Sequence, residues 1–250
     1  MECDVRSDFS PRFRPRTAGG LMCGRFTLRS DPAKLVTVFG LPTVPEVVAR
    51  YNIAPTQNVA CVLPMEMSVR WVESRWGLLL KWQSGLSGAR PVINARSETV
   101  TQKPSFRSAF QSRRCLVPCD GFFEWQALAG SSRKQPWLFT IGAGELSAFA
   151  GLYEIRADQG DPPVVSCCLL TTEANSLVSP IHDRMPVLLK SCQHEEWLHG
   201  SPDSALRLLR PYPAQFMRRV SVGSAVGNPR HESPDCVVPV GTTVLGQDSA

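Results

Sequence analysis

The spacing of apolar residues divides this chain into many short β-type segments and a few short helices. Runs of branched, aromatic or alternating apolar residues that end at Gly, Pro or polar residues are typical of strands. The runs that predict strands are Val59–Leu63, Ser68–Trp71, Ser74–Leu79, Cys115–Val117, Gly121–Gln126, Trp137–Ile141, Ala148–Ile155, Val164–Thr171, Arg219–Val222 and Val237–Val240. The segments Ala129–Gln135 and Ala157–Pro163 are predicted to form hairpin tips, and Ser84–Gly88 a loop.

Four segments carry the signals of helices. In Asp31–Phe39, Ser30 or Asp31 is placed to cap the first turn, which contains Pro32, and the apolar residues share a face. The other predicted helices are Glu98–Phe110 with a break near Pro104, Leu188–Trp197 and Pro202–Leu209. These elements predict one α+β domain with a mainly antiparallel sheet.

Composition excludes several classes of protein. The 250 residues are 43% apolar and 20% charged, which is enough apolar material for a sizeable core. No apolar run approaches the roughly 18 residues of a membrane helix, so no membrane partner is expected. The N-terminus lacks a signal peptide, and the nine cysteines then point to free thiols in a cytoplasmic protein. Because no His pair follows the cysteines, no metal site is expected.

The charge favours a phosphate-bearing partner. The net charge is +5, and 22 Arg outnumber 5 Lys. Arg binds phosphate through a planar fork, so this excess indicates a nucleic-acid partner. The alternative is an Arg-rich composition that reflects only the genome.

Cys23 is the first candidate for chemistry. It follows Met22, and residues 1–21 contain few core-forming residues. If translation begins at Met22 and that Met is removed, Cys23 becomes the N-terminus. Its amine and thiol, with pKa values of about 8 and about 8.5, would then be partly deprotonated near neutral pH. Such a pair condenses with an aldehyde and closes a thiazolidine ring. The alternative is a buried Cys beside a Gly turn.

Two further clusters place polar groups among apolar or rigid neighbours. Glu124 lies in an aromatic strand, which disfavours its charged form and suits a general acid or base; the alternative is an ion pair with an Arg. His182 lies between Pro180 and Pro186 in a predicted rigid loop, and its imidazole titrates near neutrality. Of the four His, only His182 lies in such a setting; His231 falls in a C-terminal loop.

Eight segments together resemble the SRAP family, the SOS response-associated peptidases or abasic-site processing proteins. The matching segments are Met22–Phe26, Tyr51–Thr56, Trp76–Leu78, Ile93–Thr99, Arg114–Trp125, Ala150–Glu154, Leu170–Thr172 and Ile181–Pro186. The resemblance covers about residues 22–240, which leaves 1–21 as a disordered leader or a mis-assigned start and 241–250 as a C-terminal tail. It implies a twisted, mixed β core with peripheral helices and a positively charged cleft.

The resemblance also implies a function and a set of residues. The protein would bind abasic sites in single-stranded DNA and cross-link them through Cys23, which shields the lesion during replication or the SOS response. Family members are also described as self-processing peptidases and as strand-cleaving lyases. Asn94 would orient the Cys23 terminus, Glu124 would move protons at the amine, and His182 would assist opening of the sugar ring. The expected DNA contacts are Arg25, Trp82, Arg96, Thr171 and Arg184.

The resemblance further implies a monomer without metal or organic cofactor, located with the nucleoid if bacterial and in contact with the replication machinery. One feature departs from the family, because 22 residues precede Cys23 and an amide nitrogen cannot form a Schiff base. Either Met22 is the true start or the leader is removed. Two other hypotheses about the function stay open. One is a cysteine peptidase that uses Cys23, His182 and Glu124 or Asn94. The other is a single-stranded DNA-binding module without catalysis.

Overall fold

The computed structural model describes residues 24–80, 91–157 and 162–247. Cys23 and Trp82 therefore lie outside the described residues, as do the loop Ser84–Gly88 and part of the hairpin tip Ala157–Pro163. No described helix is long and apolar enough to cross a lipid bilayer.

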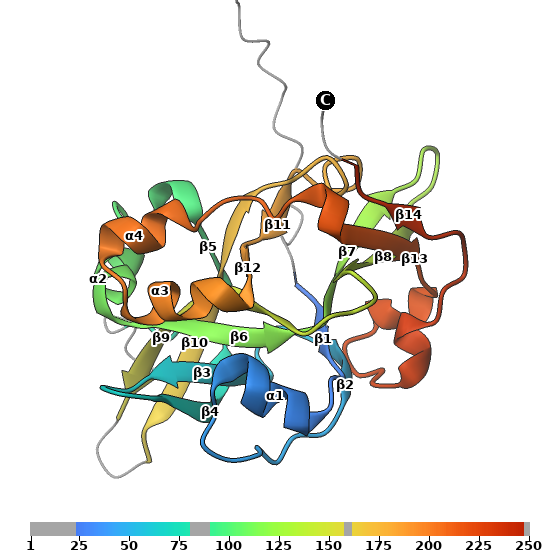
Figure 1. Ribbon diagram of the computed structural model, residues 1–250. Helices are drawn as coiled ribbons and strands as arrows, with labels where there is room; N and C mark the ends of the chain where they lie inside the picture. The colour runs from blue at the N-terminus through green and yellow to red at the C-terminus, as the bar shows by residue number, and fades with distance from the viewer. Residues whose placement is uncertain (1–23, 81–90, 158–161, 248–250) are drawn as a thin grey trace, which may run out of the picture.

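Two β-sheets form the body of the protein (Figure 1). The first has the order β14-β13-β8-β7-β1-β2. Its strands are β1 Phe26–Leu28, β2 Arg50–Ile53, β7 Gly121–Ala127, β8 Lys134–Ile141, β13 Met217–Ser221 and β14 Val244–Leu245. All of its neighbouring strands are antiparallel.

The second sheet closes on itself. It contains β3 Asn58–Pro64, β4 Val69–Trp76, β5 Asn94–Arg96, β6 Arg114–Cys119, β9 Ser147–Arg156, β10 Val164–Glu173, β11 Arg184–Pro186 and β12 Leu188–Leu189. Strands β10, β4, β3, β6 and β9 follow one another, and β9 pairs with β10 again, so these strands form a closed barrel. Only β10–β4 and β10–β5 are parallel. This confirms the predicted α+β domain with a mainly antiparallel, mixed β core.

Short helices cover the outside of the sheets. They are α1 Pro32–Phe39, α2 Pro104–Ser112, α3 His194–His199 and α4 Pro202–Arg207. The side chain of Asp31 accepts a hydrogen bond from the amide of Ala33 and so caps α1, as the sequence predicts. The 3₁₀ turns are η1 Ser97–Thr99, η2 Ser191–Gln193, η3 Ala214–Phe216, η4 Ser224–Gly227 and η5 Pro234–Val237.

An aromatic cluster joins the two sheets. The ring of Phe26 in β1 meets Trp76 of β4 edge-on at 5.2 Å and Phe149 of β9 edge-on at 5.4 Å. Phe122 of β7 packs against Phe149 as well, at 6.4 Å. All four side chains are buried, so the sheets share one core and form one domain.

Asp120 fixes the point at which the chain passes from the barrel to the other sheet. Its buried carboxylate accepts hydrogen bonds from the hydroxyl of Thr27, from the amides of Arg29 and Ser30 and from the Ser30 hydroxyl. Arg29 also pairs with it through Nε at 3.0 Å. One carboxylate thus ties the end of β1 to the start of β7, the two strands that lead to the site described below.

Four predicted elements are wrong in detail. Leu188–Trp197 is not one helix, because Leu188 and Leu189 are buried and pair with β9, and α3 begins only at His194. Val237–Val240 is not a strand: Pro239 has no N–H to donate and makes only an isolated bridge to Val222. The runs Ser68–Trp71 and Ser74–Leu79 belong to a single strand, β4, that ends at Trp76.

Candidate functional site

A pocket of about 300 Å³ opens where the chain enters β1. It is lined by residues far apart in the sequence: Gly24, Arg25, Pro55, Glu124, Trp125, Lys134, His182 and Gly227. Gly24 directly follows Cys23, so the pocket lies beside the residue that the sequence predicts as nucleophile. Two of the predicted proton-transfer residues, Glu124 and His182, thus line one cavity.

β7 holds Glu124 at this pocket. Its neighbour Phe123 is fully buried in a second apolar cluster, and the amide of Phe123 donates a hydrogen bond to the carbonyl of Arg25 at 3.0 Å. Across the sheet, Glu124 stands opposite Trp137 of β8. Glu124 itself is only 3% exposed. A carboxyl group in this position is largely shielded from bulk water.

Arg25 is tied to the C-terminal loop by its guanidinium. Nη1 donates to Asn52 Oδ1 at 2.9 Å and to the carbonyl of Val226 at 2.6 Å, and Nη2 donates to the carbonyl of Gly227 at 3.3 Å. The guanidinium also lies 5.8 Å from the ring centre of Trp125. Burial lowers the pKa of Arg25 from its usual value. The three oxygens that accept hydrogen bonds from Arg25 are neutral and do not cancel its positive charge. This charge therefore remains available to an anion in the pocket.

Asn52 links Arg25 to the same loop. Its side-chain amide is fully buried and donates to the carbonyls of Asn228 at 2.9 Å and His231 at 2.8 Å. The carboxylate of Glu232 accepts hydrogen bonds from the amides of Tyr51 and Asn52 in β2, and pairs with Arg50 at 2.9 Å. The loop is thereby fastened along β2 and around Arg25.

His182 enters the pocket from the turn before β11. The amide of Arg184 donates to its Nδ1 at 3.0 Å, and Asp183 Oδ1 lies 3.2 Å from the same nitrogen. The carbonyl of Arg184 also lies 3.2 Å from Nδ1, so this nitrogen has both a donor and acceptors as neighbours. Nε2 is the ring nitrogen that these contacts leave for a bound molecule.

Arg184 is occupied by an acidic partner. Its guanidinium forms a two-pronged pair with Glu98, at 2.6 Å and 3.0 Å, and donates to the carbonyl of Thr171 at 2.6 Å. Burial alone would raise the pKa of Glu98, but the hydrogen bond from Arg184 lowers it overall. Thr171 is fully buried, with its hydroxyl 3.5 Å from the carbonyl of Ala95. Arg184 and Thr171 therefore brace β10 against β5 and η1.

Arg96 differs from Arg184 although the two lie close together. It is exposed at the end of β5, opposite Thr171 of β10, and forms no ion pair or side-chain hydrogen bond with the rest of the described chain. Asn94 begins the same strand opposite Leu169 and is half-buried, but it is not among the described residues that line the pocket. Of the predicted DNA contacts, Arg96 is thus the one whose charge faces solvent.

Three residues at or beside the pocket, Trp125, Lys134 and Asn52, were not predicted from the sequence. Trp125 and Lys134 line the pocket, and Asn52 positions Arg25. The available signal for Asn52 was its place in the segment Tyr51–Thr56. Lys134 lies at the start of β8 beside a hairpin tip, and its sequence neighbourhood gives no signal.

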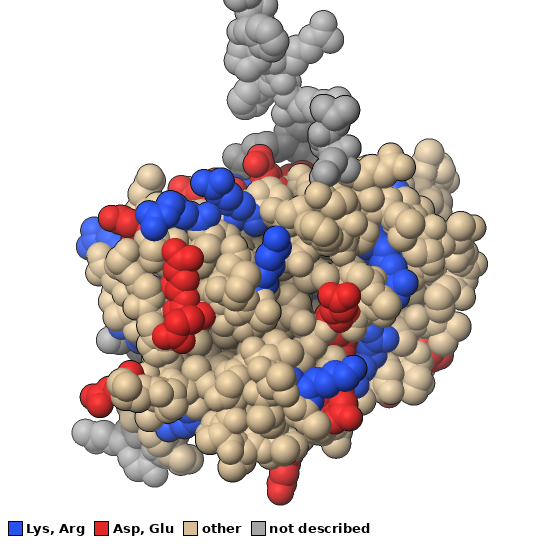
Figure 2. All heavy atoms as spheres, viewed as in Figure 1, with Lys and Arg blue, Asp and Glu red and all other residues tan. Residues whose placement is uncertain are grey.

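Charge on the face shown in Figure 2 is mixed, with Lys and Arg side chains interspersed with Asp and Glu rather than gathered in one continuous stripe. A positively charged cleft is therefore not seen on that face. In the loop that holds Arg25, but not among the residues that line the pocket, the described chain brings three metal-ligating side chains together: His231, Asp235 and Cys236.

Comparison with known proteins gives one consistent result. Residues 22–229 match the family model described as SOS response associated peptidase (SRAP). The chain is 38% identical over 222 residues to the abasic site processing protein YoqW of Bacillus subtilis, covering 86% of this chain and 99% of that protein. It is 26% identical to the abasic site processing protein YedK of Escherichia coli, over 88% of this chain and all of that protein.

A solved structure from Bacteroides thetaiotaomicron has the same fold. It superposes with a TM-score of 0.76 at 23% identity, covering 87% of this chain and 100% of that chain.

Proposed function

The chain belongs to the SRAP family of abasic site processing proteins, and from this premise we propose that it captures abasic sites in single-stranded DNA through Cys23. The observation that carries the proposal is the pocket at Gly24, which Glu124 and His182 both line. The printed names of YoqW and YedK, both abasic site processing proteins, support the choice of lesion.

The proposed reaction joins the aldehyde of the ring-opened sugar to Cys23. The α-amine attacks the aldehyde carbon and forms a carbinolamine, which loses water to give an imine. The thiol sulfur then adds to the imine carbon and closes a thiazolidine, and its proton passes to the nitrogen. The net reaction consumes the aldehyde and the free N-terminus and releases one water.

Two side chains of the pocket suit the proton transfers. Glu124 takes a proton from the attacking amine and returns it as the carbinolamine oxygen leaves as water. His182 donates through Nε2 to the sugar ring oxygen and so favours the open aldehyde. Arg25, beside the entry to β1, holds a phosphate next to the lesion. Two routes would yield the free amine: a start at Met22 followed by removal of that Met, or self-removal of the leader with Cys23 acting on its preceding bond.

The proposal places the protein at single-stranded stretches that arise during replication or an SOS response, because a paired and stacked lesion cannot reach a terminal Cys. Reversal of the cross-link and strand cleavage as a lyase belong to the same proposal, since both proceed through the imine. A cysteine peptidase acting on other proteins would have to bind a peptide carbonyl group in this pocket. The basic side chains of Arg25 and Lys134 there favour a phosphate-bearing substrate instead.

The decisive experiment is incubation with matched single-stranded oligonucleotides that do or do not contain one abasic site. We expect a heat-stable adduct, formed without borohydride, only with the abasic strand. The intact mass of the protein beforehand reports whether Cys23 is the N-terminus. Protein that begins at Cys23 but forms no adduct with the abasic strand would overturn the proposal.

Arg96 and Arg184, which lie close together, are expected to contribute differently to DNA binding. Arg96→Ala should weaken binding to single strands of any sequence and reduce the salt dependence of log K by about 0.7, because its exposed charge is free to meet one phosphate. Arg184→Ala should change the slope far less, since Glu98 already neutralises Arg184. Binding titrations over a series of salt concentrations measure both slopes. Equal losses of slope would mean that Arg184 leaves Glu98 when DNA binds.

A further inference from the structure

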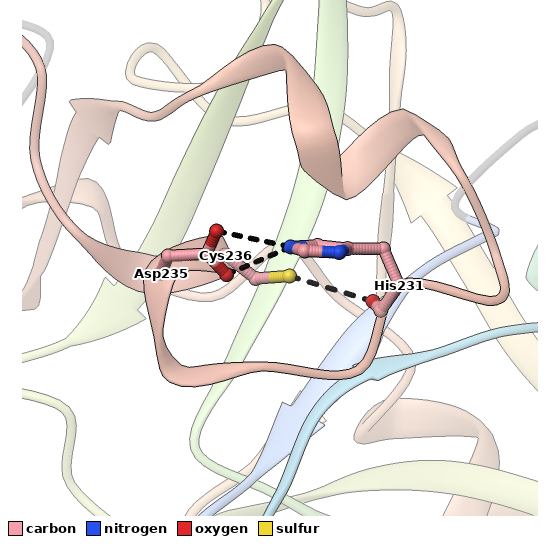
Figure 3. Close-up of side chains that lie close together, drawn as sticks. All are labelled: His231, Asp235 and Cys236. Carbon is pink, nitrogen blue, oxygen red and sulfur yellow. Dashed lines mark hydrogen bonds and ion pairs between the residues drawn. The ribbon is translucent and has the colours of Figure 1, made fainter.

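The loop that encloses Arg25 also brings together three side chains that could ligate a metal. His231, which lies between η4 and η5, converges with Asp235 and Cys236 of η5, as Figure 3 shows, and their ligand atoms all lie within 4.8 Å of one another. His231 Nε2 lies 2.8 Å and 3.0 Å from the two carboxylate oxygens of Asp235. The Cys236 thiol is directed at the carbonyl of His231, at 3.6 Å.

The three residues are held to different degrees. Cys236 is fully buried in the second apolar cluster with Phe123, Leu138, Val222 and Val226, so its sulfur is fixed by the core. The side chains of His231 and Asp235 are 34% and 56% exposed and have room to adjust. The arrangement therefore combines an anchored thiol with two ligands on the solvent side, and it leaves an entry path for an ion.

We propose that His231, Asp235 and Cys236 bind a divalent zinc-class ion. Imidazole nitrogen, carboxylate oxygen and thiolate sulfur are the three ligand types that Zn²⁺ takes in proteins. Metal–ligand distances of about 2.0–2.3 Å in a tetrahedron put neighbouring ligand atoms about 3.3–3.7 Å apart. The present separations reach that range by shifts of about 1 Å, with His231 and Asp235 parting slightly and both approaching the sulfur.

The thiolate among the three proposed ligands determines which class of metal ion the site prefers. Hard ions such as Mg²⁺ and Ca²⁺ prefer oxygen ligands, whereas imidazole with thiolate favours Zn²⁺ and Co²⁺. Binding converts the Cys236 thiol into a metal thiolate and releases one proton to solvent. Water completes the fourth position on the exposed side of His231 and Asp235.

The consequence of a bound ion would be structural. The same loop supplies the carbonyls of Val226 and Gly227 to Arg25, and those of Asn228 and His231 to Asn52. A metal ion bound by His231, Asp235 and Cys236 would cross-link the two ends of the segment 231–236 and so hold these carbonyls in place. This inference goes beyond the proposed function and does not depend on it, because none of the three ligands lines the pocket described above.

Cobalt binding tests the site directly. The experiment uses the Cys23→Ala variant, because a terminal amine and thiol would chelate metal by themselves. We expect one Co²⁺ to bind with a cobalt–thiolate charge-transfer band in the near ultraviolet, and Zn²⁺ to displace it. Cys236→Ser should abolish the band, and a Cys192→Ser control at an exposed thiol elsewhere should leave it unchanged.

If Cys236→Ser fails to fold, variants of the two exposed ligands still test the metal site. His231→Gln and Asp235→Asn should each weaken Co²⁺ affinity by more than the roughly 10–100-fold that loss of an outer-shell partner costs. Binding without the thiolate band would mean that Cys236 is not a ligand, and unchanged affinity in both variants would mean that His231 and Asp235 form only an ion pair. Either result would overturn the inference. Cross-linking is not measured, so failure of the proposed function leaves this result intact.

Discussion

Replacement of Cys23 by Ala is expected to abolish the heat-stable adduct with abasic single-stranded DNA while DNA binding persists. An amine alone stops at the imine, and only the neighbouring thiol closes the thiazolidine. Cys23→Ser should therefore give a labile imine that borohydride traps. The measurement is the yield of adduct after heating, with and without reduction, alongside the affinity for an intact single strand.

Two controls separate the thiol from the amine. Cys192→Ala removes an exposed thiol outside the pocket and should leave the adduct unchanged. Protein that retains one extra residue before Cys23 keeps the thiol but lacks the α-amine of Cys23, and it should form no thiazolidine. A normal adduct from either Cys23→Ala or the extended protein would refute the proposed nucleophile.

Glu124→Gln and His182→Ala are expected to slow adduct formation by about 10²–10⁴-fold each, the usual contribution of a general acid or base. The Gln side chain keeps the shape of Glu124 inside the pocket but cannot take up a proton. His182→Ala removes the Nε2 donor, so its loss should be larger on the closed sugar than on an aldehyde analogue that is already open. Glu124→Gln should slow both substrates alike. Single-turnover rates of adduct formation over a range of pH measure each effect.

Matched variants test whether the losses come from the pocket. Glu154→Gln changes another buried carboxyl, which pairs with Arg113 at 2.8 Å away from the pocket, and His199→Ala changes an exposed His on α3. Neither should slow the reaction by more than threefold. If Glu124→Gln and His182→Ala lose the same factor on both substrates, the division of labour between them is wrong even though the pocket is right.

Most of the β core could be predicted from the sequence, because Gly121–Ala127, Ser147–Arg156 and Val164–Glu173 carry long runs of branched and aromatic residues. The closure of the barrel could not, since it depends on β10 pairing with β9, β4 and β5 at once. The two-residue strands β12 and β14 also escape prediction. Their register comes from partners distant in the sequence, and Leu188–Leu189 fits a helical pattern equally well.

The chemical groups of the candidate site could be predicted from the sequence, but the contacts between residues distant in the sequence could not. Glu124 and His182 were found from their local settings, and the structure places both at one pocket. That Arg184 is neutralised by Glu98 could not be foreseen, because nothing in a loop residue's neighbourhood reports a carboxylate 86 positions away. The grouping of His231 with Asp235 and Cys236 is local, yet a spacing of four and five residues gives a metal signal only when the turn between them is known.

The contact of Glu232 with β2 has a consequence for how copies of this protein behave toward one another. β2 is the last strand of its sheet, and such a strand offers unpaired amides to any extended chain that meets it. Here the amides of Tyr51 and Asn52 are already donated to the Glu232 carboxylate, which also places a negative charge along the strand. A single side chain from the C-terminal loop thereby occupies amides with which a strand of a second molecule would pair, and a charge on an edge strand is a device by which native sheets disfavour edge-to-edge association.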